Sequence, residues 1–174
     1  GVLDFDTCFT ARTYLRQAGK HFGSAAALEK SLTTRTAINP ADGRPFYNPN
    51  PGPDGLNSRQ KMITFIENHD GINRFRVDGI TERRNRLAQG LVMTLPGIPC
   101  LYYGTEFALA DQTGKIGEDS ETGRLMFFPR RNAPTITEVK NSASFTEIRA
   151  LADLRKRLPV LRSGDVIPLW VDSD

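Results

Sequence analysis

The apolar positions of this chain fall into short runs that are separated by longer stretches with helical spacing. Three runs are apolar and partly β-branched, which predicts strands, and they lie at residues 1–5, 62–66 and 98–103. The third run is apolar almost throughout, which is typical of a strand that is covered on both faces. A further apolar run at residues 166–171 predicts the first strand of a separate unit.

Stretches with helical spacing follow the first three predicted strands. The predicted helices lie at residues 10–18, 24–32, 81–95 and 144–158. The third helix carries Leu87, Leu91 and Leu95 at four-residue spacing and ends before a Pro-Gly pair. The fourth begins with Ser144-Phe-Thr-Glu147, which is a capping-box pattern. Alternating strands and helices predict an α/β fold in which the strands pair in parallel through right-handed crossovers.

Two loops interrupt this order. Residues 36–60 contain five prolines and three glycines, which exclude a long helix or an interior strand. A loop of this length is often functional, and an ordered surface excursion without a role is an equal alternative. Residues 111–124 form a polar, acidic loop that does not match the EF-hand spacing, so a solvated loop is favoured over a calcium site.

Three βα units by themselves would leave two open sheet edges and a half-covered core. The chain also begins without Met inside a predicted strand, and it stops soon after another. We therefore expect a piece of a longer polypeptide. The remainder of the fold, or self-association, is expected to cover the open edges.

The composition fits a globular protein and narrows the classes of partner. Of the 174 residues, 39% are hydrophobic and 25% are charged, with a net charge of +3. The basic runs at 83–86 and 155–157 are interpreted as solvated helix faces, so no nucleic-acid partner is expected. The longest strongly apolar stretch, residues 91–103, is shorter than the roughly 20 residues of a membrane span, so no membrane partner is expected.

The cysteines and glycines exclude several kinds of site. Cys8 and Cys100 are too few for a disulfide framework and lack a metal-type spacing, so each is interpreted as a buried, small apolar residue. They leave the localisation open. No glycine-rich phosphate-binding motif is present. His21 has no recognisable spacing to His69 that would make the two a pair of metal ligands, so it is interpreted as a surface or half-buried helix residue.

The most informative polar residues follow the second predicted strand without a break. They are Glu67, Asn68, His69 and Asp70. In a parallel β/α architecture, catalytic residues lie at this end of the strands. A structural hydrogen bond is the commoner explanation of a His-Asp pair, but at a strand end beside Glu67 a functional role is at least as well supported.

Further acidic and aromatic residues are expected at the same rim. They follow the other two strands and are Asp4, Asp6, Glu106, Phe5, Tyr102, Tyr103 and Phe107. Carboxylates accept hydrogen bonds from hydroxyl groups, and aromatic rings stack on the apolar faces of sugars. The rim therefore favours a neutral polyhydroxylated ligand.

Four segments resemble the α-amylase superfamily of glycoside hydrolases, in the order of that family. Phe65-Ile-Glu-Asn-His-Asp70 matches the motif that ends the seventh barrel strand, and Gly97-Ile-Pro-Cys-Leu-Tyr-Tyr-Gly-Thr-Glu106 resembles the eighth-strand segment. Residues 1–6 are similar to the sixth strand, and residues 154–164 to the end of the eighth helix. The resemblance implies that residues 1–164 are the last three βα units of a (β/α)8 TIM barrel. Residues 165–174 would then begin a C-terminal β-domain or form a linker.

The resemblance also implies a chemistry. Such enzymes cleave α-glucosidic bonds with retention, using an Asp nucleophile from the fourth strand and a Glu general acid from the fifth, and neither has a match here. Asp70 matches the third carboxylate, which stabilises the transition state by binding sugar hydroxyls. His69 matches the histidine that hydrogen-bonds the same sugar. Arg74 is expected to orient nearby carboxylates.

The parent protein is therefore expected to hydrolyse α-1,4-glucosidic bonds in starch or maltooligosaccharides, while this chain alone is expected to be inactive. No metal or other cofactor is expected in this chain; calcium is possible in the full-length parent, through a domain upstream. The alternatives within the family are transglycosylation, isomerisation and α-1,6 cleavage. A non-catalytic binding or partner subunit is an alternative of a different class.

Overall fold

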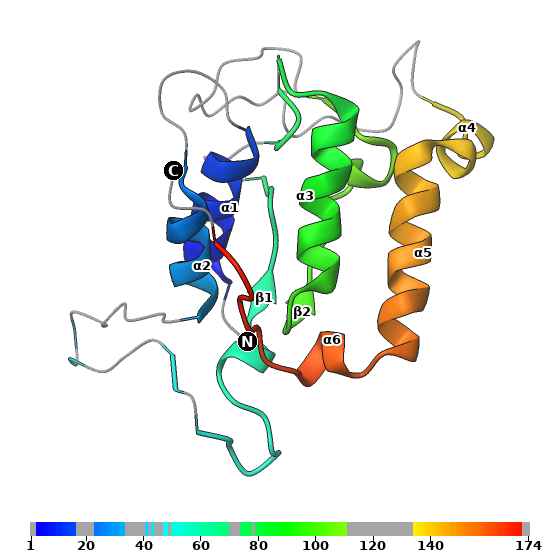
Figure 1. Cartoon of the computed structure of the whole chain (residues 1–174). Helices are drawn as coiled ribbons and strands as arrows, with labels where there is room; N and C mark the ends of the chain where they lie inside the picture. Colours follow the sequence, from blue (N-terminus) through cyan, green and yellow to red (C-terminus); the bar gives the residue numbers. More distant parts are fainter. Residues whose placement is uncertain are drawn as a thin grey trace.

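The computed structural model describes residues 3–16, 23–33, 41, 43, 47–48, 50–69, 74–77, 79–110 and 134–171. The helices in this part are α1 (Phe5–Arg16), α2 (Ala25–Thr33), α3 (Glu82–Thr94), α4 (Ile136–Asn141), α5 (Ala143–Arg157) and α6 (Val160–Ser163). The strands are β1 (Ile63–Thr64) and β2 (Ile98–Pro99), and the 3-10 turns are η1 (Arg59–Lys61) and η2 (Thr105–Phe107). In Figure 1, α1 and α2 lie on the side of β1, and α3 and α5 lie on the side of β2.

Three extended segments lie side by side in parallel at the centre. Ile63 of β1 is opposite Ile98 of β2, and Leu3 forms a parallel bridge with Ile63 on the other side. The order Leu3, β1, β2 agrees with the parallel βα order expected from the sequence. The regular strands are shorter than the predicted runs at 62–66 and 98–103.

The first helix begins earlier than the spacing predicted. Asp4 Oδ1 accepts a hydrogen bond from Thr7 N at 3.1 Å, which is the geometry of a side-chain cap at a helix N-terminus. The chain therefore turns from its bridge at Leu3 directly into α1 at Phe5, and the predicted start at residue 10 is wrong.

Helix α3 and the turn after it agree with the prediction. Thr81 Oγ1 caps α3 by accepting from Arg84 N at 3.2 Å, and the helix ends at Thr94, one residue short of the expected range. Gly97 has a φ of +104°, and a Cβ atom there would lie 2.6 Å from the carbonyl oxygen of Met62. Only glycine therefore lets β2 approach β1 at this point.

The capping box lies elsewhere than predicted. Ser142 caps α5 by accepting from Phe145 N, and the capping box is formed by Thr135 and Glu138 at the start of α4. Ser144 is fully buried and donates to Glu82 Oε1 at 3.5 Å, because it already lies inside α5 on the face that packs against α3.

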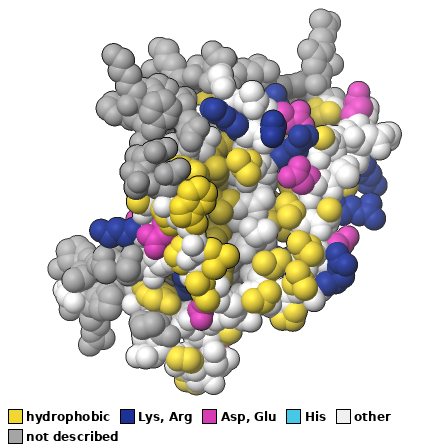
Figure 2. Space-filling model, in the orientation of Figure 1, with side chains coloured by type: hydrophobic (Ala, Val, Ile, Leu, Met, Phe, Trp, Pro, Cys, Tyr) yellow, Lys and Arg dark blue, Asp and Glu magenta, His cyan; other side chains and the backbone are white. Residues whose placement is uncertain are grey.

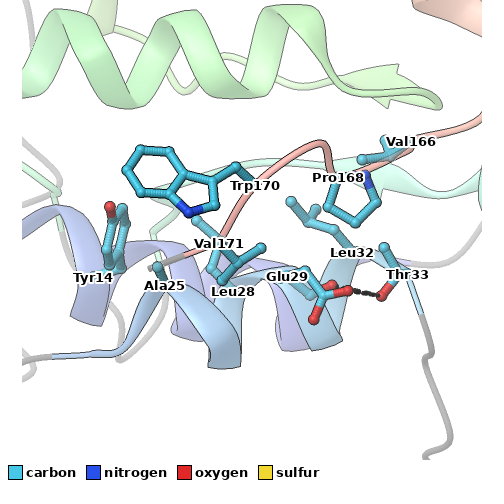
Figure 3. Close-up of a pocket in the computed structure, with 10 residues that line it drawn as sticks. All are labelled: Tyr14, Ala25, Leu28, Glu29, Leu32, Thr33, Val166, Pro168, Trp170 and Val171. Carbon is cyan, nitrogen blue, oxygen red and sulfur yellow. Dashed lines mark hydrogen bonds between the residues drawn. The ribbon is translucent and has the colours of Figure 1, made fainter. Parts of the chain in front are cut away.

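The C-terminal segment forms neither helix nor strand over residues 164–171, so the strand predicted at 166–171 is absent. It passes along α2 and encloses a pocket of about 390 Å³ with it. Figure 3 shows Trp170 and Pro168 facing Leu28 and Leu32 of α2 across this pocket. Apolar side chains also gather on the outer face of this segment and around α6 (Figure 2), where Leu169 and Trp170 are 96% and 85% exposed.

The buried hydrophobic cluster connects α1 to α3. Its members come from these helices and from the segment after β1: Ala11, Ile66, Phe75, Val77, Ile80, Ala88 and Val92. No helix among the described residues is long and apolar enough to cross a membrane. Cys8 and Cys100 are free thiols; Cys8 is buried as predicted, but Cys100 is exposed, so the prediction that it is buried is wrong.

Candidate functional site

The polar residues after β1 differ in exposure. Glu67 is 3% exposed, Asn68 is half-buried and His69 is exposed. Asp70, the predicted transition-state stabiliser, lies outside the described residues. The described part of the predicted site is therefore a buried carboxylate followed, two residues later, by an accessible imidazole.

Glu67 uses both carboxylate oxygens inside the protein. Its Oε2 accepts from Phe75 N at 2.6 Å, and its Oε1 accepts from Thr105 Oγ1. Arg74 Nη1 lies 3.8 Å from the same Oε1. Because Thr105 follows β2, this carboxylate joins the ends of the two strands, and it is not available to a ligand.

Arg74 is a completely buried cation in contact with a carboxylate and two rings. Its guanidinium lies 4.7 Å from the ring centre of Tyr102 and 4.9 Å from that of Tyr103. None of its nitrogens donates a hydrogen bond to a residue that the structure describes. The contact with Glu67 agrees with the expected orienting role, and the rings stabilise the charge where water is excluded.

His69 and the two tyrosines form the accessible part of the site. The rings of His69 and Tyr102 have centres 6.4 Å apart, and those of Tyr102 and Tyr103 meet edge to face at 4.5 Å. Both tyrosines are half-buried. An imidazole beside a half-buried aromatic residue can hydrogen-bond a sugar hydroxyl while an accessible ring edge or face contacts an apolar sugar face.

Two residues of the predicted rim have structural roles instead. Asp4 is 2% exposed and caps α1, so its carboxylate faces the protein. The ring of Phe5 packs against Phe65 at 5.1 Å and against Phe9 at 5.9 Å between ring centres. The rim is consequently less acidic toward a ligand than the sequence predicted.

Sequence reasoning missed Arg12 and Arg16 of α1, which are 6% and 7% exposed. Burial lowers the pKa of Arg12, and burial together with the Arg12 charge lowers the pKa of Arg16 to about 9. Both donate hydrogen bonds to the backbone around the predicted site. A signal was present: two arginines four residues apart share a helix face with Cys8 and Ala11.

No group of three His, Cys, Asp or Glu side chains within the described ranges could hold a metal ion. The acidic loop at 111–124 lies outside those ranges. A calcium site in a longer protein therefore stays a prediction.

Comparison with known proteins gives relatives of one kind. No family model matches the chain. A cyclomaltodextrin glucanotransferase from Paenibacillus macerans is 35% identical over 113 residues, which cover 65% of this chain and 14% of the relative. An α-amylase from Niallia circulans is 30% identical over 113 residues and is covered to 19%. The chain thus spans under a fifth of the length of these curated relatives.

Solved structures agree with the sequence relatives. The cyclomaltodextrin glucanotransferase CldA superposes with a TM-score of 0.67 and 25% identity, over 98% of this chain and 28% of that protein. An α-amylase from Anoxybacillus superposes with a TM-score of 0.63 and 26% identity, over 98% of this chain and 31% of that protein. By sequence and by fold, this chain is homologous to cyclomaltodextrin glucanotransferases and α-amylases and corresponds to a part of these barrel enzymes.

Proposed function

We propose that the chain is the sugar-binding side of a retaining α-glucan-active hydrolase and supplies its last three βα units. The observation that carries the proposal is the exposed imidazole of His69 beside Tyr102, at the end of a parallel strand and within the motif Phe65–Asp70. The relatives named α-amylase support α-1,4-glucan as the substrate class.

The roles follow from the chemistry of glycoside hydrolysis. His69 hydrogen-bonds a hydroxyl of the sugar whose bond is broken, and Asp70 stabilises the transition state through hydroxyls of the same sugar. Such hydrogen bonds strengthen as positive charge develops on the ring and contribute several kcal/mol. The nucleophile and the general acid come from the fourth and fifth strands of the complete barrel.

The sheet geometry supports a larger assembly as the active form. Leu3 and β2 are the outer extended segments of the described sheet, and Leu3 and Ile98 are 44% and 53% exposed. Further parallel strands would pair with these edges and complete the barrel. The required partner is the remainder of the barrel, and a second copy could cover the same edges.

Two assays test the proposal. The 174-residue chain is expected to release no reducing sugar from starch or maltoheptaose, because it lacks the nucleophile and the general acid. Turnover that Asp70→Asn abolishes would contradict this. In a complete barrel that contains these residues, Asp70→Asn is expected to lower kcat by about two orders of magnitude or more with an unchanged circular dichroism spectrum.

Transglycosylation is the second candidate, because relatives at 35% and 32% identity are named cyclomaltodextrin glucanotransferases. Product analysis with the complete barrel distinguishes the two: linear maltooligosaccharides indicate hydrolysis, and cyclic or transferred products indicate the transferase. A non-catalytic partner subunit is tested by the coding sequence upstream of Gly1, which would then lack the Asp nucleophile and the Glu general acid.

A further inference from the structure

Two arginines of helix α1, Arg12 and Arg16, are buried, although charged side chains are rarely buried. Arg12 and Arg16 lie four residues apart on one face of the helix, and their guanidinium groups are 5.9 and 5.4 Å from the ring centre of Phe75. Burial lowers the pKa of both groups, and the charge of Arg12 lowers that of Arg16 further. Apolar residues could fill the same volume without the cost of burying a charge. What the arginines add is the hydrogen bonds that their guanidinium groups donate.

Both arginines donate hydrogen bonds to backbone carbonyls that flank the segment 67–73. Arg12 Nη1 donates to the carbonyl of Ile66 at 2.5 Å. Arg16 Nη2 donates to the carbonyls of Arg74 at 2.7 Å and Phe75 at 3.0 Å. Helix α1 therefore binds the backbone on both sides of the segment, at Ile66 after β1 and at Arg74 and Phe75.

Glu67 closes the same two ends from within. Its Oε2 accepts a hydrogen bond from Phe75 N at 2.6 Å. Glu67 directly follows Ile66, and Phe75 is also bound by Arg16, so this bond links the two chain positions that the arginines hold. The bond from Thr105 Oγ1 to Oε1 adds the end of β2. His69 lies two residues from Glu67, between the two chain positions that these contacts hold.

We propose that Arg12 and Arg16 are positioning residues that fix His69 toward the sugar by clamping the backbone at Ile66, Arg74 and Phe75. The proposal rests on the sugar-binding role given to His69 above. The arginines act through backbone carbonyls and do not contact the ligand. Arginine suits this role because its planar fork can donate to two carbonyls at once, which lysine cannot do in the same geometry.

The test compares Arg16→Lys, Arg16→Met and Arg12→Lys with Arg83→Lys, which changes an exposed arginine of α3. Hydrogen exchange at the Phe75 amide and the imidazole signals of His69 are measured by NMR. We expect the first three variants to speed Phe75 exchange about tenfold and to shift the His69 signals, while the amides at the centre of α5 keep their protection. Arg83→Lys is expected to match the parent.

Maltoheptaose titration separates this inference from the proposed function. If the unmodified chain binds maltoheptaose, Arg16→Lys is expected to weaken binding about tenfold. The α5 amides of this variant should exchange their hydrogens as slowly as those of the parent. If the unmodified chain does not bind, the proposed function of the chain fails, and Phe75 exchange with the His69 signals still decides whether the clamp exists. Unchanged exchange and unchanged His69 signals in both lysine variants overturn the inference, even if Arg16→Met fails to fold.

Discussion

At the scale of single residues, the structure assigns buried charges to internal roles and leaves the imidazole accessible. Glu67 and Asp4 look alike in the sequence as acidic rim residues, yet both are engaged by backbone amides. His69 is exposed beside Tyr102. The residues available to a sugar are thus fewer than the acidic pattern indicates.

The Cys8 thiol gives a prediction about pH. Burial raises its pKa from 9.0 to about 12, with Asp4 and Glu67 acting in the same direction and Arg12 and Arg16 opposing. Between pH 9 and 12 the folded state keeps this proton and the unfolded state loses it, so the contribution of Cys8 is complete below pH 9 and is lost as pH rises through that window.

Urea unfolding of the parent and of Cys8→Ala at pH 8.5 and pH 10.5 measures this effect. The parent should lose up to about 1.4 kcal/mol per pH unit relative to the variant. Cys100→Ala is the matched control, because that thiol is exposed. Equal pH slopes for the parent and Cys8→Ala would show that the thiol is not held protonated.

At the scale of elements, local signals located helices well and their ends less well. Thr81 and the Pro-Gly pair mark both ends of α3 because caps and breakers act within a few residues. The start of α5 was misplaced because Ser144 fits a capping box in sequence but is buried against α3. The early start of α1 depends on Asp4, whose backbone is hydrogen-bonded to Ile63.

The turn before β2 gives a prediction at this scale. Gly97→Ala places a methyl group 2.6 Å from the Met62 carbonyl at a positive φ, and should lower the free energy of unfolding by about 2–4 kcal/mol. Gly90→Ala in α3 meets no neighbouring atom and should raise it by about 0.5–1 kcal/mol. Denaturant melts of both variants measure the difference, and equal effects would exclude the close approach as the cause.

At the scale of the whole molecule, the open edges of the sheet give a prediction about association. Leu3 and Ile98 carry exposed apolar side chains at edges that have no further strand partner among the described residues, and Phe9 of α1 is exposed as well. We expect concentration-dependent self-association, because a second copy can pair with the open strand edges and bury the exposed apolar side chains. Sedimentation velocity across a hundredfold concentration range measures it, and a single monomeric species throughout would contradict it.

The sequence by itself determined the order of the three central extended segments and of α1, α2, α3 and α5, the ends of α3 and the relationship to the α-amylase superfamily. These features depend on contiguous motifs and on spacing within a few residues, which can be read without a fold. The role of Asp70 was predicted in the same way and stays a prediction, because Asp70 lies outside the described residues.

Only the tertiary structure decided which charged groups are buried and what they hold. Arg12 reaches a carbonyl 54 residues away, and Arg16 reaches one 58 residues away. Glu67 bonds Thr105 across 38 residues. No local period encodes such pairs, because they arise when parallel strands bring separate segments to one rim, where burial favours hydrogen bonds between the polar groups that meet there.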